Sequence, residues 1–371
     1  MTPAGGGADA ESTSGRRPDP GSGDHRAPSQ CRSVRATTRT RPRGTRPATR
    51  HSPGHAALPG PAALPGPVAR AGAVGCAAGD DLRVPEGDSV YLVARTLDAR
   101  LAGTTVRRSD LRVPRHATAD LSGRAVLGTA SRGKHLLTRF SGGLTLHTHL
   151  RMDGSWTVLA PGKVLPRRVQ PDVRVLLATT GGPGVADGAP GPTAVALSMP
   201  VVELVETATE GDVVGHLGPD LLGDDWVDGG AEEAVRRLSA RPDRAVKLAL
   251  LDQRNVAGVG NMWADETCFL RGLDPWTPVG EVDLPPLVAL VARMLRHSVE
   301  APGAYQVTTG DARRGRSHWV VGRAGKPCLR CGTTVRVRAE VAGDPEQRRT
   351  WWCPRCQPEP AVRADPQASR S

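Results

Sequence analysis

The sequence predicts an α+β protein of several domains, in which a β-rich domain precedes a helical domain and a small cysteine-containing module. Short β-type runs separated by glycine and proline fill residues 104–205. Apolar residues recur at helical spacing over residues 231–299, and two Cys-x2-Cys pairs follow near the C-terminus. A length of 371 residues is enough for two or three such domains.

The first 83 residues differ in composition from the rest of the chain. They are dense in Gly, Pro, Ala, Ser and Arg, contain no Phe, Tyr or Trp, and show no apolar periodicity. Such a segment cannot bury enough apolar surface to offset the entropy lost on folding. We expect residues 1–83 to be disordered or wrongly included in the reading frame, and residues 359–371 to form a disordered tail.

The net charge of +11 is unevenly distributed. Residues 1–83 hold 12 Arg against 6 Asp or Glu, so +6 of the charge lies there and +5 on residues 84–371. This balance supports a polyanionic partner only weakly, so the motifs must identify the partner. The chain has no run of 18 apolar residues and no apolar signal-peptide stretch, so we expect no membrane span and a cytoplasmic location.

Pro85 and Glu86 stand directly before a helix that the apolar spacing of residues 91–101 predicts. A proline nitrogen is an amine nucleophile only at the start of a chain, because inside a peptide bond it is a planar, non-basic amide. In the chain as printed, Pro85 should therefore be inactive as a nucleophile.

The β-type runs favour a sandwich or a barrel, since few helices interrupt them. Residues 179–193 are rich in Gly and Pro, and we expect them to form a loop. The runs are Thr105–Val106, His135–Thr138, Leu144–His147, Trp156–Leu159 and Val173–Leu177.

Two cysteine pairs, Cys328–Cys331 and Cys353–Cys356, are separated by 21 residues. Four thiolates at this spacing are typical of a tetrahedral zinc ribbon. Because four cysteines leave no open coordination position, the Zn²⁺ should be structural rather than catalytic. The isolated cysteines Cys31, Cys76 and Cys268 should be inert.

A helical hairpin is predicted over residues 250–266, with a Gly-containing turn and a second helix that begins at Asn261. The first turn of a helix has unpaired N–H groups that bind a phosphate well, and the Asn261 amide adds a donor. A helix pair that serves only for packing is the alternative.

The order of these motifs resembles the formamidopyrimidine-DNA glycosylase and endonuclease VIII family over residues 84–357. The family opens with Pro-Glu, as at Pro85, and continues with a Gly-Lys-His element (residues 133–135) and a His-Leu-x-Met-x-Gly element (residues 149–154). The helical hairpin and the cysteine module complete the match. The resemblance implies a catalytic two-layer β-sandwich with flanking helices over residues 84–205, a helix-two-turn-helix domain over 206–320 and a zinc finger over 321–358.

The same resemblance implies a bifunctional DNA glycosylase and AP lyase of base excision repair. Pro85 would form a Schiff base with the sugar of a damaged nucleotide, since an α-amino group has a pKa of about 7.7 to 8.0 and is partly neutral at physiological pH. Glu86 would move protons on that sugar. Lys134 would bind phosphate or assist the acid–base steps; the alternative for Lys134 is an exposed lysine at a strand end.

Contacts to double-stranded DNA are implied for three further residues. Asn261 and Arg348 would grip phosphates beside the lesion, with Arg349 as the competing choice for the finger arginine. Met152 would fill the gap left by the flipped base, unless it packs into the core. We expect the protein to act as a monomer.

Sequence elements that differ between the two branches of the family indicate the substrate. The formamidopyrimidine branch carries an Asp-Pro-Arg-Arg-Phe-Gly element, and nothing in residues 169–205 matches it. This absence and the Pro-Glu-Gly-Asp opening at residues 85–88 favour an endonuclease VIII-like enzyme that removes oxidised pyrimidines and cuts by β,δ-elimination. A formamidopyrimidine or 8-oxoguanine type of glycosylase and a catalytically inactive zinc-ribbon DNA-binding protein are the alternatives.

The position of Pro85 predicts where translation starts. Val84 occupies the place of the family's initiator Met, so we expect its codon to be GUG and the natural product to begin at Pro85 after removal of that first residue. A protease that cuts after Val84 would have the same effect.

Overall fold

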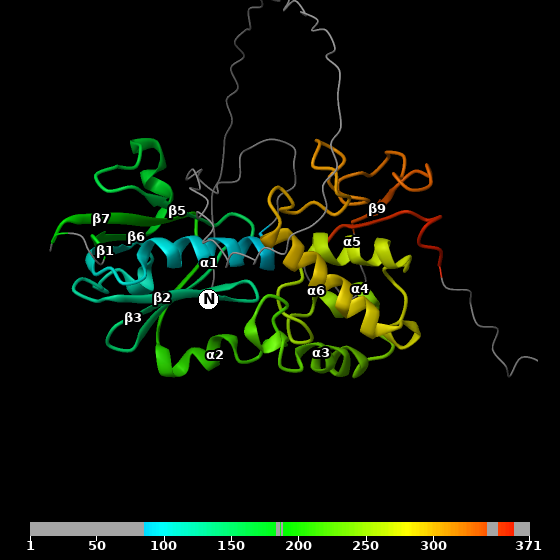
Figure 1. Cartoon of the computed structure of the whole chain (residues 1–371), viewed down its shortest axis with the longest axis horizontal. Coiled ribbons are helices and arrows are strands. Elements are labelled where there is room, and N and C mark those ends of the chain that lie inside the picture. Colours follow the sequence, from blue (N-terminus) through cyan, green and yellow to red (C-terminus); the bar gives the residue numbers. More distant parts are fainter. Residues whose placement is uncertain (1–84, 183–185, 187, 340–347, 360–371) are drawn as a thin grey trace, which may run out of the picture. The chain divides into compact units, whose positions relative to one another are not determined.

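The computed structural model describes residues 85–182, 186, 188–339 and 348–359 (Figure 1). The expectations for residues 1–83, for Val84 and for the tail from residue 360 onward lie outside the described residues. No described helix is both long enough and apolar enough to cross a bilayer.

Helix α1 (Gly87–Leu101) begins directly after Glu86, one turn earlier than the apolar spacing indicated. A capping box starts it: the Glu86 N–H donates to Ser89 Oγ at 2.7 Å, which occupies a donor that the helix itself cannot pair. Val90 and Leu97 lie on the buried face of α1. The helix contacts strands of both sheets of the β domain.

The β domain is a sandwich of two four-stranded antiparallel sheets rather than a barrel. Phe140 and Leu146 from one sheet and Leu177 and Ala196 from the other belong to one buried core. One sheet has the order β2-β3-β4-β8, with strands Val126–Arg132, His135–Phe140, Leu144–His149 and Val201–Glu206. The other has the order β1-β6-β7-β5, with strands Val106–Leu111, Val173–Thr180, Pro190–Leu197 and Ser155–Leu159.

The loop predicted over residues 179–193 is shorter than expected. Strand β6 continues to Thr180 and β7 begins at Pro190, and these two residues are paired. A Cβ atom at Gly191 would lie 1.9 Å from the carbonyl oxygen of Thr180, so only glycine fits there. The glycine and proline that suggested a loop therefore belong partly to strands.

The helical domain contains α2 to α6, and its core includes the buried side chains of Trp263 and Phe269 on α5 and of Val291 on α6. Helix α5 begins at Asn261, as predicted. The helices are α2 (Glu210–Val214), α3 (Gly230–Ser239), α4 (Val246–Leu251), α5 (Asn261–Arg271) and α6 (Leu284–Glu300). Short 3-10 helices are η1 (Pro114–His116), η2 (Arg167–Asp172), η3 (Thr207–Thr209), η4 (Asp224–Trp226) and η5 (Val279–Glu281).

The cysteine module contributes a hairpin of β9 (Arg336–Arg338) and β10 (Thr350–Trp352). Its Trp351 and Cys353 are part of the same buried core as α5 and α6. The module therefore packs on the helical domain through shared apolar contacts.

Candidate active site

The Glu86 side chain reaches from the start of α1 to the first turn of α5. Its Oε1 accepts a hydrogen bond from the Met262 N–H at 2.7 Å, and its Oε2 accepts one from the Trp263 N–H at 3.3 Å. The expectation that the first turn of α5 offers free N–H groups to a phosphate is therefore wrong for these two groups. A carboxylate of the chain itself occupies them.

Glycines permit this approach of α1 to the turn before α5. The Gly87 N–H donates to the carbonyl oxygen of Gly258 at 2.9 Å, and Gly258 has a φ of 99° that favours glycine. A Cβ atom at Gly260 would lie 2.2 Å from Cδ of Glu86. The turn is thus built to receive the Glu86 carboxyl group.

Burial raises the pKa of Glu86 to about 7, the charge of Lys134 opposes this rise, and the carboxyl group of Asp88 adds to it. Asp88 is buried as well, and its Oδ2 accepts a hydrogen bond from Ser298 Oγ at 2.8 Å. A carboxyl group with a pKa near 7 can both give and take protons at neutral pH. Pro85, half-buried, is the residue that precedes it.

Lys134 lies in the turn between β2 and β3 and is half-buried. The preceding residue, Gly133, has a φ of 57°, and its N–H donates to Asp220 Oδ2 at 2.7 Å, which ties this turn to the helical domain. The Lys134 charge influences both Glu86 and His149. The structure therefore places the predicted lysine within electrostatic range of the predicted acid.

Sequence reasoning missed a histidine cluster beside Lys134. His135 Nδ1 lies 2.8 Å from His147 Nε2, and His147 Nδ1 lies 2.9 Å from Glu203 Oε2. Burial lowers the pKa of His135 to about 3 and that of His149 to about 4, helped by neighbouring positive groups. The rings of His135 and His149 are therefore neutral at physiological pH. The alternation of His147 and His149 along one strand was the available signal, since such residues share a face.

Asn261 lies against the segment that carries both candidate arginines. Its Nδ2 donates to the backbone carbonyl oxygen of Arg349 at 2.9 Å. Arg348 is half-buried and Arg349 is exposed. Two DNA-contact candidates from distant parts of the sequence, Asn261 and the arginine segment, are thus brought together.

Met152 lies in the turn between β4 and β5, where Arg151 has a φ of 46°. Its side chain is 64% exposed, which rules out the alternative of core packing. An apolar side chain held in solvent by a tight turn is available to a ligand.

The four predicted cysteines converge. Their sulfur atoms all lie within 4.8 Å of one another, and Cys328 and Cys353 are buried. The Arg330 N–H donates to Cys328 Sγ at 3.4 Å. Four sulfur donors around one point, with a backbone N–H directed at one of them, fit a tetrahedral metal ion. Cys268 is buried and belongs to the helical core, whereas Cys31 and Cys76 lie outside the described residues.

Comparison with known proteins agrees with this geometry. Residues 84–186 match the model of the formamidopyrimidine-DNA glycosylase N-terminal domain, and residues 217–308 match that of its H2TH domain. A probable endonuclease 8 2 of Streptomyces coelicolor is 50% identical over 280 residues, which cover 76% of this chain and 96% of the relative. The DNA-(apurinic or apyrimidinic site) lyase Nei2 of Mycolicibacterium smegmatis is 43% identical, with 74% of this chain and 99% of the relative covered.

A solved structure shows the same fold. The Lactococcus lactis Fpg (MutM) protein in complex with DNA that contains N7-benzyl-Fapy-dG matches with a TM-score of 0.58 and 22% identity. The match covers 74% of this chain and all of that one, 100%. The chain belongs to the formamidopyrimidine-DNA glycosylase and endonuclease VIII family, on its endonuclease VIII branch.

Proposed function

We propose that this chain is a bifunctional DNA glycosylase and AP lyase of base excision repair that acts on oxidised bases in duplex DNA. The observation that carries the proposal is the buried Glu86 carboxyl group, which is held by α5 directly beside Pro85. A proton-transfer group with a pKa near 7 next to an amine nucleophile is what Schiff-base chemistry on a sugar requires.

The reaction follows from these two residues. Attack of the Pro85 nitrogen on C1′ forms a C–N bond and breaks the glycosidic bond, and the departing base takes up the proton that the Pro85 amine gives up. Glu86 supplies the proton that opens the sugar ring at O4′, which leaves an iminium between Pro85 and C1′. Loss of a C2′ proton then expels the 3′ phosphate, and loss of a C4′ proton expels the 5′ phosphate. Water finally hydrolyses the C–N bond and frees the Pro85 amine.

Four further residues bind the DNA in this proposal. Lys134 holds a phosphate near the reacting sugar, and Asn261 and Arg348 hold phosphates beside the lesion. Met152 enters the space that the flipped nucleotide leaves, in keeping with its exposure. Arg348 is preferred over Arg349 because its position five residues before Cys353 matches the family's finger arginine.

One Zn²⁺ held by Cys328, Cys331, Cys353 and Cys356 completes the site. It supplies structure only, because four thiolates fill its coordination sphere. The protein acts as a cytoplasmic monomer on damaged duplexes.

The chemistry needs a free amine at Pro85. The family's N-terminal domain is matched from residue 84 onward, beside Pro85. We infer that translation starts at a GUG codon for Val84, or that a protease cuts after Val84. Any other valine codon there would contradict this start site, and N-terminal mass spectrometry of the cellular protein would identify the first residue.

Borohydride trapping on an abasic duplex tests the enzymatic function. A protein that begins at Pro85 should be linked covalently to the DNA, and the full printed chain, with Pro85 inside a peptide bond, is the matched control that should not be. Failure of the Pro85-initiated protein to form an adduct would leave the inactive zinc-ribbon DNA-binding protein as the better explanation.

The substrate class is proposed to be oxidised pyrimidines. Relatives named endonuclease 8 reach 50% identity, whereas a formamidopyrimidine-DNA glycosylase of Heliobacterium modesticaldum reaches 31%. A panel of duplexes with single lesions, assayed with the Pro85-initiated protein, tests this. Faster release of 8-oxoguanine than of any oxidised pyrimidine would favour the formamidopyrimidine type instead.

A further inference from the structure

Lys247 is a buried lysine that the proposed mechanism does not use. It lies on α4, and its side chain is 2% exposed. Its Nζ forms an ion pair with Asp265 Oδ1 at 2.7 Å and donates hydrogen bonds to Thr350 Oγ1 at 2.8 Å and to the Arg349 carbonyl oxygen at 3.0 Å. The buried ammonium group thus has two hydrogen-bond acceptors and one carboxylate oxygen as its partners.

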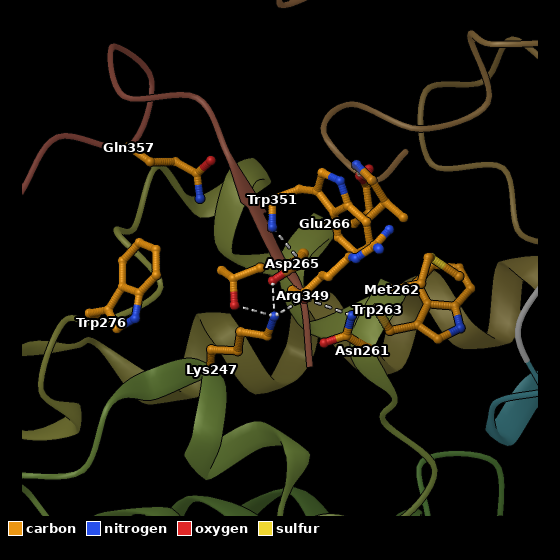
Figure 2. Close-up of polar contacts among 12 residues, drawn as sticks. Lys247, Asn261, Met262, Trp263, Asp265, Glu266, Trp276, Arg349, Trp351 and Gln357 are labelled. Carbon is orange, nitrogen blue, oxygen red and sulfur yellow. Dashed lines mark hydrogen bonds and ion pairs between the residues drawn. The ribbon is translucent and has the colours of Figure 1, made fainter. Parts of the chain in front are cut away.

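Asp265 extends the same contact along the finger segment. It lies on α5, its side chain is fully buried, and its Oδ2 accepts a hydrogen bond from the Trp351 N–H at 3.0 Å. Lys247 and Asp265 together therefore bind three consecutive residues, 349 to 351, where the chain enters β10. Figure 2 shows Lys247, Asp265 and Trp351 meeting in this way.

Stability alone does not account for a buried ion pair at this position. Removing two charges from water costs about as much as their attraction returns, and apolar residues of similar size often serve the fold as well. An ion pair does fix geometry, because each of its hydrogen bonds has a preferred direction. Its partners here are backbone groups and one hydroxyl of a single short segment, which points to control of the position of that segment.

The Arg349 carbonyl oxygen connects this pair to the DNA-contact residues. It accepts from Lys247 Nζ and also from Asn261 Nδ2 at 2.9 Å (Figure 2). A carbonyl oxygen has two lone pairs and can hold both donors. If the Asn261 amide left this carbonyl to bind a phosphate, the hydrogen bond from Lys247 would still hold the segment.

We propose that Lys247 and Asp265 are positioning residues that fix the backbone of residues 349–351 and so hold Arg348 ready for a DNA phosphate. The inference rests on the proposed function only in its last step, the phosphate contact of Arg348. Lys247 itself is enclosed and reaches no DNA, so it acts through the arginine segment.

Binding of the Pro85-initiated protein to a duplex with a tetrahydrofuran abasic-site analogue provides the test. Lys247→Met should weaken binding about tenfold and lower the slope of log affinity against log salt by about 0.9, the loss of one phosphate contact. Arg348→Gln should have a similar effect alone and little further effect in the Lys247→Met background. Lys247→Met/Asp265→Asn, which leaves neither charge buried alone, should reproduce the result.

Gln357→Leu is the matched control. Gln357 is also buried, and it also ties the finger to the helical domain, through Cys353 N–H to Oε1 at 2.9 Å and Nε2 to the Leu273 carbonyl oxygen at 2.8 Å. The changes in DNA affinity caused by Gln357→Leu and by Arg348→Gln should multiply in the double variant, because the two residues act independently. If the Lys247 and Arg348 effects also multiply independently, Lys247 only supports the fold and the proposal is overturned.

Hydrogen exchange without DNA separates failure of this inference from failure of the proposed function. Lys247→Met should speed exchange of the Trp351 amide while the zinc content stays unchanged. If Arg348→Gln leaves binding unaffected, the proposed phosphate contact is wrong, and exchange then decides whether the pair fixes the segment. Unchanged protection of the Trp351 amide would refute the positioning role.

Discussion

Glu86 and Asp265 are both buried carboxyl groups attached to the same helix, α5, and they differ in what surrounds them. Glu86 comes from another domain and accepts the N–H groups of the first turn, beside half-buried Pro85 and Lys134. Asp265 belongs to α5 itself and is enclosed with Lys247. Burial shifts the pKa of both carboxyl groups. A catalytic carboxyl group differs from a structural one in that a ligand can reach it.

The pKa values of the two groups are shifted in the same direction. Burial raises the pKa of Glu86 to about 7 and that of Asp265 to about 6, the latter opposed by Lys247 at 2.7 Å. The charge of Lys134 opposes the rise at Glu86 in the same way, so the two groups are distinguished by access to a ligand.

The largest expected effect is on the rate of strand cleavage, in which Glu86 and Asp265 should differ. Glu86→Gln should slow strand cleavage of an abasic duplex by about a thousandfold, because it removes the proton-transfer group, with DNA binding retained. Asp265→Asn should instead weaken binding and leave single-turnover cleavage at saturating protein nearly unchanged. Both variants are made in the Pro85-initiated protein. If both lose the same amount of cleavage activity, the distinction between a catalytic Glu86 and a structural Asp265 is wrong.

For the free energy of unfolding, the Lys247–Asp265 pair should matter more than Glu86. Lys247→Met leaves the Asp265 charge buried without its partner, which costs about 3 to 5 kcal/mol in the free energy of unfolding. Lys247→Met/Asp265→Asn should recover part of that loss. Denaturant unfolding at neutral pH measures both, and a double variant less stable than the single one would contradict the pairing argument.

The pH dependence of stability sharpens the comparison further. The folded-state pKa of Glu86 is raised from 4.5 to about 7, so the folded state binds more protons than the unfolded state between these values. Stability contributed by the protonated group is therefore present below pH 4.5 and is lost as the pH rises to 7, by up to about 3 kcal/mol. Burial also raises the pKa of Asp265 to about 6, so that group adds a decline of its own below pH 6. Glu86→Gln should remove the part of the decline between pH 6 and pH 7, and an unchanged decline in that range would show that another group causes it.

The smallest effect is expected at Met152. Because its side chain is 64% exposed, Met152→Ala should change the free energy of unfolding by less than about 0.5 kcal/mol. Met152→Ala should slow the release of a damaged base more than the cleavage of an abasic site, because an abasic site has no base to flip out of the duplex. Equal slowing on both substrates would argue against a role in filling the gap.

Motifs with a fixed local spacing could be predicted from the sequence. The four cysteines converge as expected, α5 begins at Asn261, and the β-type runs form a sandwich. The 179–193 loop was overestimated because Gly191 is needed for a close strand contact rather than for a turn.

Contacts between distant segments could not be predicted in this way. Glu86 meets an N–H group 176 residues away, and Lys247 meets Thr350 at a separation of 103 residues. Neither partner has a local pattern that reveals the other, since a buried lysine and an exposed one look alike in a sequence. The chain must fold before such pairs are visible.

Gly260 has a consequence for the interpretation of mutants. It lies in the matched H2TH domain, in the turn before the proposed DNA-contact residue Asn261, yet a side chain there would collide with Glu86. A variant such as Gly260→Ala would therefore lose catalysis through displaced acid–base chemistry and could be mistaken for a DNA-binding mutant. In the proposed mechanism both domains hold the acid–base group, so the effect of a mutation in either domain has to be assigned by assay rather than by location.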